Sequence, residues 1–230
     1  MTLSAGANLA EIAALVGDPG RANMLAAMLD GRPLAASELA DIAGVAAATA
    51  SGHLAKLAEG GLVSVEARGR QRLFRLATPQ VAQMLESVMV VAAAGERPTR
   101  ATPRTPRHLR DARTCYDHLA GRLGVGLADS LSAMGAIRLS SRGAEVLPEG
   151  AAILARLQLE PPAVPGERRP LCRACLDWSE QRFHVGGALG QTLLQRLLQL
   201  SWIERGPRPR EILVSASGRR ELKESFGLDL

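Results

Sequence analysis

Apolar residues in the first third of the chain recur at the spacing of amphipathic helices and then alternate as in strands. Helical spacing, with apolar residues three and four positions apart, is found over residues 8–16, 19–29, 37–43 and 46–59. Strand-like alternation follows in 62–66 and 73–76, on either side of a turn at Arg68-Gly69-Arg70. The pattern predicts short helices followed by a two-stranded hairpin.

The segment from Ala36 to Leu76 combines two of these helices with the hairpin. Gly44 follows the first helix and predicts a left-handed cap that ends it. The second helix places Ala50, Leu54 and Leu57 on one face, which leaves the opposite face polar. A helix, a tight turn, a second helix and a basic hairpin together predict a winged helix-turn-helix, with the hairpin as its wing.

A polar helix of this kind can enter the major groove of DNA, and arginines in the hairpin can contact the phosphate backbone or the minor groove. The expected partner is therefore double-stranded DNA. The candidate DNA contacts are Thr49, Ser51, His53 and Lys56 on the helix, and Arg68, Arg70 and Arg72 in the wing. The hydroxyls of Thr49 and Ser51 suit phosphates as well as base edges.

Three stretches of this region resemble the ArsR/SmtB family of bacterial repressors. They are Val16-Gly17-Asp18-Pro19-Gly20-Arg21, Ser37-Glu38-Leu39-Ala40, and the run TASGHLAKLAEGGLV from Thr49 to Val63. The resemblance covers about residues 8 to 95. It implies a homodimeric winged-helix repressor that leaves its operator when an inducer, often a metal ion, binds. It also implies that a helix over residues 79–94 pairs with the first helix of a second subunit.

The sequence departs from the family at the recognition helix and at the family's usual metal sites. Ala46-Ala47-Ala48 stands where relatives often have Ser and Gln, and Gly52 where they often have His, so fewer side chains remain to read bases. No cysteine pair precedes the turn, and residues 81–94 offer only Glu86 as a ligand. Any inducer is therefore expected to bind beyond residue 110.

Charge and cysteine content narrow the class of protein. The 230 residues include 28 Lys and Arg against 23 Asp and Glu, and all the basic residues except Lys56 and Lys223 are Arg. Arginine suits phosphate contacts, although a GC-rich genome would also encode many arginines. No basic N-terminal region precedes an apolar core, so we expect a cytoplasmic protein without a membrane span. Its three cysteines are then expected as thiols or metal ligands rather than in disulfides.

Composition changes between residues 96 and 113, where Pro and Arg are frequent and apolar residues are few. This composition predicts a linker. The linker separates a DNA-binding and dimerisation domain over residues 1–95 from a second domain over residues 114–230. Its arginines are expected to be solvated, with contacts to DNA flanks or to another subunit as the alternative.

Two parts of the second domain resemble each other. Cys115-Tyr116-Asp117 recurs as Cys175-Leu176-Asp177, and the run 118–124 recurs, after a six-residue insertion, as 184–190. We predict two degenerate helix-hairpin-helix repeats, at about residues 115–158 and 175–226, packed face to face because one copy alone cannot bury its apolar face. The whole chain is then mainly α-helical with small β-hairpins.

The repeated domain contains residues that suit a metal ion. A Cys-x-x-Cys pair and a Cys-x-x-His pair supply four ligands, and one more histidine could replace any of them. These candidate ligands are Cys115, His118, Cys172, Cys175 and His184. Zinc favours such residues, while thiolates also bind other soft ions or oxidise to a disulfide. In the alternative interpretation the cysteines are small buried residues before helices that Asp117 and Asp177 cap.

Aromatic residues also gather in this domain, and they suggest an organic ligand as a third kind of inducer. They are Tyr116, Trp178, Phe183 and Trp202. Such side chains can line an apolar pocket between the two copies. They can equally form the core of a domain otherwise built from Leu and Ala.

The sequence favours a transcriptional regulator over an enzyme. It contains no Gly-rich phosphate loop, no nucleophile elbow and no metalloprotease helix. We therefore predict a sequence-specific DNA-binding repressor that is released when a metal ion, a thiol-reactive species or a small ligand binds the C-terminal domain. The alternative is a protein-interaction adaptor that uses a winged-helix fold without binding an operator.

Overall fold

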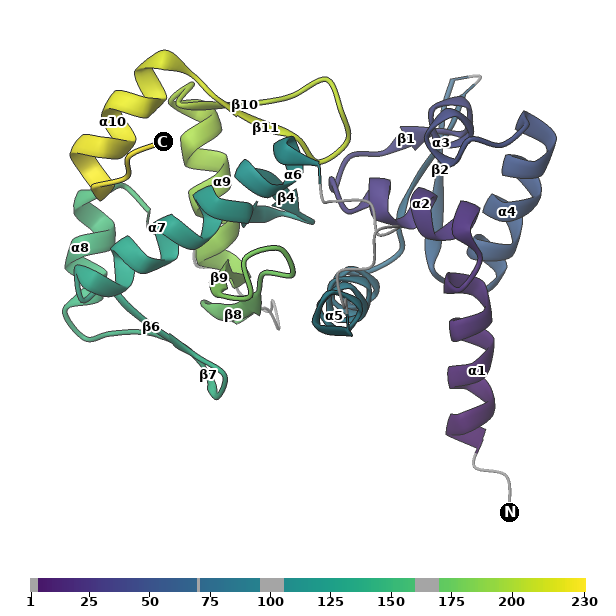
Figure 1. The fold of residues 1–230 in the computed structure, drawn as a ribbon, viewed down its shortest axis with the longest axis horizontal. Helices are drawn as coiled ribbons and strands as arrows, with labels where there is room; N and C mark the ends of the chain where they lie inside the picture. The colour runs from purple at the N-terminus through teal and green to yellow at the C-terminus, as the bar shows by residue number, and fades with distance from the viewer. Residues whose placement is uncertain (1–3, 70, 96–105, 160–169) are drawn as a thin grey trace. The chain divides into compact units, whose positions relative to one another are not determined.

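The computed structural model describes residues 4–69, 71–95, 106–159 and 170–230 (Figure 1). The chain divides into two compact units, Met1–Glu86 and Ser87–Leu230. Among the described residues, none of the helices has both the length and the apolar character needed to cross a membrane.

The first unit is a winged helix-turn-helix, as the sequence predicts. Its elements are α1 (Ser4–Val16), α2 (Pro19–Met28), β1 (Leu34–Ala35), α3 (Ala36–Ala43), α4 (Ala47–Glu59), β2 (Val63–Arg68) and β3 (Gln71–Leu76), and α5 (Pro79–Gly95) begins there. The three strands form one antiparallel sheet in the order β1-β3-β2. The prediction that α3 and α4 are joined by a tight turn and followed by a hairpin is confirmed.

Local chemistry explains where these helices begin and end. The side chain of Asp18 caps α2 by accepting a hydrogen bond from the backbone N–H of Arg21, and Pro19 follows at the first helical position. Gly44 ends α3 with φ of 66°, the left-handed conformation that glycine adopts without steric strain. The buried residues of the unit include Met24, Leu25, Leu39, Leu54, Leu57 and Phe74. They hold α2, α3 and α4 against the sheet.

The second unit repeats one order of elements. After α6 (Arg107–Asp111), the first half is β4 (Arg113–Cys115), β5 (His118–Ala120), α7 (Gly121–Ala133), β6 (Ile137–Ser140), β7 (Gly143–Val146) and α8 (Gly150–Arg156). The second half is β8 (Arg173–Leu176), β9 (Phe183–Gly186), α9 (Gly187–Gln199), β10 (Ile203–Arg205), β11 (Ile212–Val214) and α10 (Ala216–Phe226). The order hairpin, helix, hairpin, helix therefore occurs twice.

This order differs from the predicted helix-hairpin-helix unit, because each half starts with an additional hairpin. The strands of these two hairpins have only three or four residues, which is too short for an alternating pattern to be recognised. The predicted linker also ends earlier than expected. Residues 107–111 form α6 and Arg113 is buried, whereas residues 96–105 lie outside the described part of the chain.

The two halves of the second unit pack across each other. Helix α7 lies against strand β9 of the other half, and α9 lies against β5. Glycines allow this close approach. A Cβ atom added at Gly124 of α7 would lie 2.5 Å from the carbonyl oxygen of Leu119 and 3.7 Å from Cβ of His184. One added at Gly190 of α9 would likewise collide with the carbonyl of Val185 and approach Cβ of His118.

One hydrophobic core serves both halves. Helix α7 contributes Leu123, Leu127 and Leu131, and α9 contributes the corresponding Leu189, Leu193 and Leu197. Further core residues come from the second hairpin of each half and from α10. A single half of about 45 residues would bury too little apolar surface to be stable alone. The halves are therefore expected to fold as one unit.

Replacing Gly124 tests the close packing of α7 on the hairpin. Gly124→Ala is expected to lower the free energy of unfolding by about 1–3 kcal/mol because the added methyl group meets backbone atoms that cannot move aside. Gly126→Ala in the same helix is the matched control, since its Cβ would meet only the flexible end of Leu228. We expect this control to lie within about 1 kcal/mol of wild type, because alanine favours helix over glycine. Chemical denaturation measures both, and equal effects would contradict the packing.

Candidate DNA-binding face and cysteine–histidine cluster

Helix α4 presents a polar, exposed face. Thr49, Ser51 and Lys56 are exposed, whereas Ala50, Leu54 and Leu57 on the opposite face are buried. The exposed residues are three of the four candidates that the sequence assigns to this helix. A face of this kind has the size and the polarity that fit the major groove.

His53, the fourth candidate on α4, is held by the preceding helices. Its Nε2 lies 3.7 Å from Oδ1 of Asp18, and its Nδ1 lies 3.4 Å from Nη1 of Arg21. Arg21 also donates hydrogen bonds to the carbonyls of Leu15 and Ala14 near the end of α1, at 2.7 and 2.8 Å. His53 thus joins α4 to the corner between α1 and α2, and its use in DNA contact stays a prediction.

The wing carries exposed arginines beside a buried aromatic residue. Arg68 and Arg72 are exposed on β2 and β3, and Arg70 lies outside the described residues. The guanidinium carbon of Arg72 lies 5.6 Å from the centre of the Phe74 ring, within the range of a cation–π contact. Phe74 is buried and pairs with Val65 across the hairpin. The wing therefore has an anchored base and a positively charged surface.

The second unit brings four of the five candidate metal ligands together. One ligand atom from each of Cys115, His118, Cys175 and His184 lies within 4.8 Å of all the others. Each half supplies one pair, because Cys115 faces His118 across the β4–β5 hairpin and Cys175 faces His184 across the β8–β9 hairpin. The two histidine rings stack with centres 5.1 Å apart, and the two Sγ atoms lie 3.9 Å apart. We call these four residues the cysteine–histidine cluster.

The cluster is buried, and its histidines face carboxylates. Cys115, His118 and His184 are at most 2% exposed, while Cys175 is half-buried. Nδ1 of His118 lies 3.2 Å from Oδ1 of Asp117, and Nδ1 of His184 lies 3.7 Å from an oxygen of Asp177. Burial lowers the pKa of His118, but Cys115 and Asp117 together raise that pKa to about 9. Nε2 of His118 and both ring nitrogens of His184 lack a hydrogen-bond partner among the described residues.

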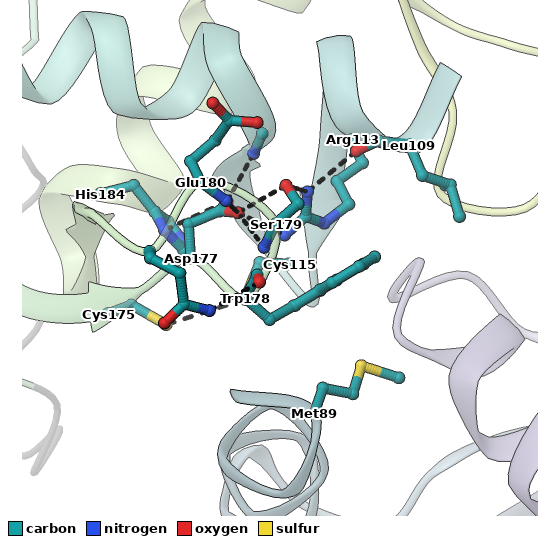
Figure 2. A network of polar contacts seen from close by, with 12 residues as sticks. Met89, Leu109, Arg113, Cys115, Cys175, Asp177, Trp178, Ser179, Glu180 and His184 are labelled. Carbon is teal, nitrogen blue, oxygen red and sulfur yellow. Dashed lines mark hydrogen bonds and ion pairs between the residues drawn. The ribbon is translucent and has the colours of Figure 1, made fainter. Parts of the chain in front are cut away.

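Asp177 organises the surroundings of the cluster (Figure 2). Its Oδ1 accepts hydrogen bonds from Nη2 of Arg113 at 3.0 Å, from the backbone and hydroxyl of Ser179, and from the backbone of Glu180. Its Oδ2 accepts the backbone N–H of Gly121, the first residue of α7, at 2.7 Å. Burial opposes ionisation, but Arg113, His184 and these hydrogen bonds hold the pKa of Asp177 well below its usual range.

Two residues of this network have roles that the sequence did not predict. Arg113 was expected in a solvated linker, yet it is fully buried, pairs with Asp177, and lies with its guanidinium carbon 4.3 Å from the centre of the Trp178 ring. The sequence favoured Asp177 as a cap for the helix of its own repeat. The structure instead places it at the start of α7, a helix of the other half.

Cys172 lies apart from the cluster. It is buried among the residues of the hydrophobic core, and burial raises the pKa of its thiol to about 11. Of the Cys-x-x-Cys pair, Cys175 therefore belongs to the cluster and Cys172 to the hydrophobic core. The fourth residue of the cluster is His184, where the sequence pattern had favoured Cys172. All three cysteines belong to the described part of the chain, and none is in a disulfide.

The four candidate pocket residues occupy different surroundings. Tyr116 forms the turn of the β4–β5 hairpin with φ of 61°, and Phe183 lies in β9. Trp178 lies beside Arg113, as described above, while Trp202 packs on the hydrophobic core. All four are half-buried. A shared ligand pocket stays a prediction.

Comparisons with known proteins agree with the first unit and extend over the second. Residues 5–66 match the model of a helix-turn-helix domain. The HTH-type transcriptional regulator YdfF of Bacillus subtilis is 41% identical over 212 residues, which cover 92% of this chain and 94% of that protein.

Two solved structures each match about two fifths of this chain. One is the homodimeric winged helix-turn-helix DNA-binding domain of Mb0332 from Mycobacterium bovis, a possible ArsR-family regulator. It is 29% identical with a TM-score of 0.35, and the match covers 37% of this chain and 79% of that chain. The other is the cadmium sensor CMTR from Mycobacterium tuberculosis. It is 28% identical with a TM-score of 0.32, and the match covers 42% of this chain and 99% of that chain.

Replacing Asp177 tests the buried network. Asp177→Asn is expected to destabilise the protein by about 3–5 kcal/mol, because it leaves the guanidinium of Arg113 buried without an opposite charge. Asp129→Asn is the control. It breaks an ion pair with Arg182 whose side chains are 48% and 60% exposed, and such pairs contribute at most about 1 kcal/mol. Thermal and chemical unfolding compare the two, and a mild effect at Asp177 would refute its structural role.

Proposed function

Since this chain belongs to the helix-turn-helix transcriptional regulators, we propose that it binds an operator in double-stranded DNA as a homodimer and is released by an inducer held in its C-terminal unit. The observation that carries the DNA-binding part is the exposed polar face of α4 within the same unit as the exposed arginines of the wing. In this arrangement α4 enters the major groove, while Arg68 and Arg72 contact the backbone or the minor groove beside it.

Exposed apolar residues on two helices support the homodimer. Leu9 of α1 is 69% exposed, and Val88 and Val91 of α5 are 49% and 73% exposed. Apolar side chains at this exposure on helices favour a partner surface. The resemblance to the ArsR/SmtB family assigns these same helices to the subunit interface. A two-fold dimer would place two α4 helices on half-sites about one turn of DNA, or about 34 Å, apart.

The buried cluster in the second unit supports release by an inducer. Thiol and imidazole groups offer a metal ion or a thiol-reactive species a defined place to bind, and the half-buried aromatic residues leave an organic ligand as the other class. The N-terminal unit lacks thiols altogether, since the chain's three cysteines all lie beyond residue 110. Binding in the second unit would lower operator affinity by favouring a conformation of the dimer that fits DNA less well.

Salt dependence tests the role of the wing. Arg72→Ala is expected to weaken binding to all DNA sequences and to reduce the slope of log K against log salt by about 0.9, since one phosphate contact is lost. Arg142→Ala, an exposed arginine of the second unit, should leave the slope unchanged. Fluorescence anisotropy at several salt concentrations measures both. An unchanged slope for Arg72→Ala would remove the wing from the interface, and absence of binding to any genomic fragment would favour the adaptor.

A charged residue introduced into α5 tests whether this helix forms part of the dimer interface. Val91→Asp is expected to convert the dimer to a monomer and to weaken operator binding at least about tenfold, since one helix per dimer no longer reaches its half-site. Leu171→Asp places the same charge on another exposed apolar residue, 51% exposed, and should change neither property. Light scattering coupled to size-exclusion chromatography determines the mass. A Val91→Asp protein that stays dimeric would exclude this part of α5 from the interface.

A further inference from the structure

We propose that Cys115, His118, Cys175 and His184 bind one zinc ion in tetrahedral coordination, so that the metal fastens the two halves of the C-terminal unit together. The proposal goes beyond operator binding and does not depend on it. It assigns the cysteine–histidine cluster a metal class and a mechanical role.

The distances within the cluster fit a tetrahedral ion. Two sulfur atoms bound to zinc at about 2.3 Å lie about 3.8 Å apart in a tetrahedral site. The Sγ atoms of Cys115 and Cys175 are 3.9 Å apart. Since the ligand atoms of the four residues all lie within 4.8 Å of one another, an ion placed among them needs only small adjustments of the side chains to reach all four.

A carboxylate lies beside Nδ1 of each histidine, which leaves the Nε2 atoms for the metal. A neutral histidine whose Nδ1 donates to a carboxylate keeps the lone pair of Nε2 for a metal, which displaces the Nε2 proton of a charged ring, and such carboxylates commonly support zinc sites. Asp117 accepts from Nδ1 of His118, and Asp177 lies near Nδ1 of His184. Nε2 of His118 and both ring nitrogens of His184 are buried without a hydrogen-bond partner in the described part of the chain, and a metal bound at the two Nε2 atoms would remove part of this cost.

The type of ligand selects the metal. Two thiolates and two imidazoles in a tetrahedral arrangement suit zinc, whereas magnesium and calcium prefer oxygen ligands in larger numbers. A buried site with four protein ligands also leaves no open position for a substrate, so a structural or regulatory ion fits better than a catalytic one.

The origin of the ligands determines what the ion does. Each hairpin contributes one cysteine and one histidine, and the two hairpins belong to different halves of the unit. Both histidines also lie at the crossing contacts, since Gly124 of α7 approaches His184 and Gly190 of α9 approaches His118. Loss of the ion would therefore weaken the contact between the two halves.

Metal content of the full chain, purified without chelator, is the first test. We expect one zinc per chain by mass spectrometry. Cys115→Ser and His184→Gln should each lose at least half of this zinc, while Cys172→Ser, which changes a buried cysteine outside the cluster, should keep it. Since no DNA is present, failure here leaves operator binding untouched and failure of operator binding leaves the zinc site untouched.

Cobalt and thiol labelling test the wild-type chain, so that a poorly folding variant cannot obscure the result. Cobalt added to the metal-free protein should give the visible bands of a tetrahedral ion and a thiolate-to-cobalt charge-transfer band. Metal should protect Cys175, the half-buried thiol of the cluster, from alkylation. Octahedral cobalt spectra, metal retained by a Cys115→Ser/Cys175→Ser chain, or metal-free protein with a Cys115–Cys175 disulfide would each overturn the proposal.

Thermal unfolding tests whether the ion stabilises the contact between the two halves. Removal of zinc by a chelator should lower the Tm of wild type by about 5–10 °C, the shift expected for a ligand present at 100 times its Kd in a domain of this size. The same treatment should leave the Tm of Cys115→Ser unchanged. Equal Tm values for wild type with and without zinc would refute the fastening role.

Discussion

The C-terminal unit depends on one buried carboxylate. Asp177 neutralises Arg113, accepts the first backbone N–H of α7, and stands beside His184, so one side chain connects the start of β4, a helix of the first half and a hairpin of the second. A buried ion pair is costly to form, and it stabilises a structure only when its remaining hydrogen bonds are satisfied. Here Ser179 and Glu180 donate to Asp177, and Arg113 donates to the carbonyl of Leu109 and the hydroxyl of Ser179, which leaves Nε of Arg113 without a partner among the described residues. The cysteine–histidine cluster lies against this fixed frame.

The N-terminal unit was predictable because its signals are local. The 3.6-residue period of α4, the glycine after α3 and the alternation of β2 and β3 each arise within one short segment, and each agrees with the others. The contacts of His53 were harder to predict from the sequence. Its contacts with Asp18 and Arg21 come from residues more than thirty positions away, and a histidine on the polar face of a helix gives no sign of them.

The C-terminal unit shows what a sequence pattern leaves out. Repetition of Cys-x-Asp and of a histidine followed by glycines indicated a duplication, and the candidate ligands included all four cluster residues. The pattern did not give the first hairpin of each half, and it paired Cys172 with Cys175 because they are close in sequence. The structure pairs residues by strand register, so His184, nine positions after Cys175, is its partner. Arg113 was assigned to a linker because composition carries no information on burial.

A cluster that draws matched pairs from two halves of one polypeptide has a consequence for how it responds to dilution. A comparable site shared between two subunits disassembles when the protein becomes scarce, because its halves then separate. Here the crossing of α7 and α9 holds the halves at a fixed effective concentration, set by the fold and independent of the number of molecules in the cell. Occupancy of the cluster therefore reports the free concentration of whatever it binds, even for a protein present in few copies.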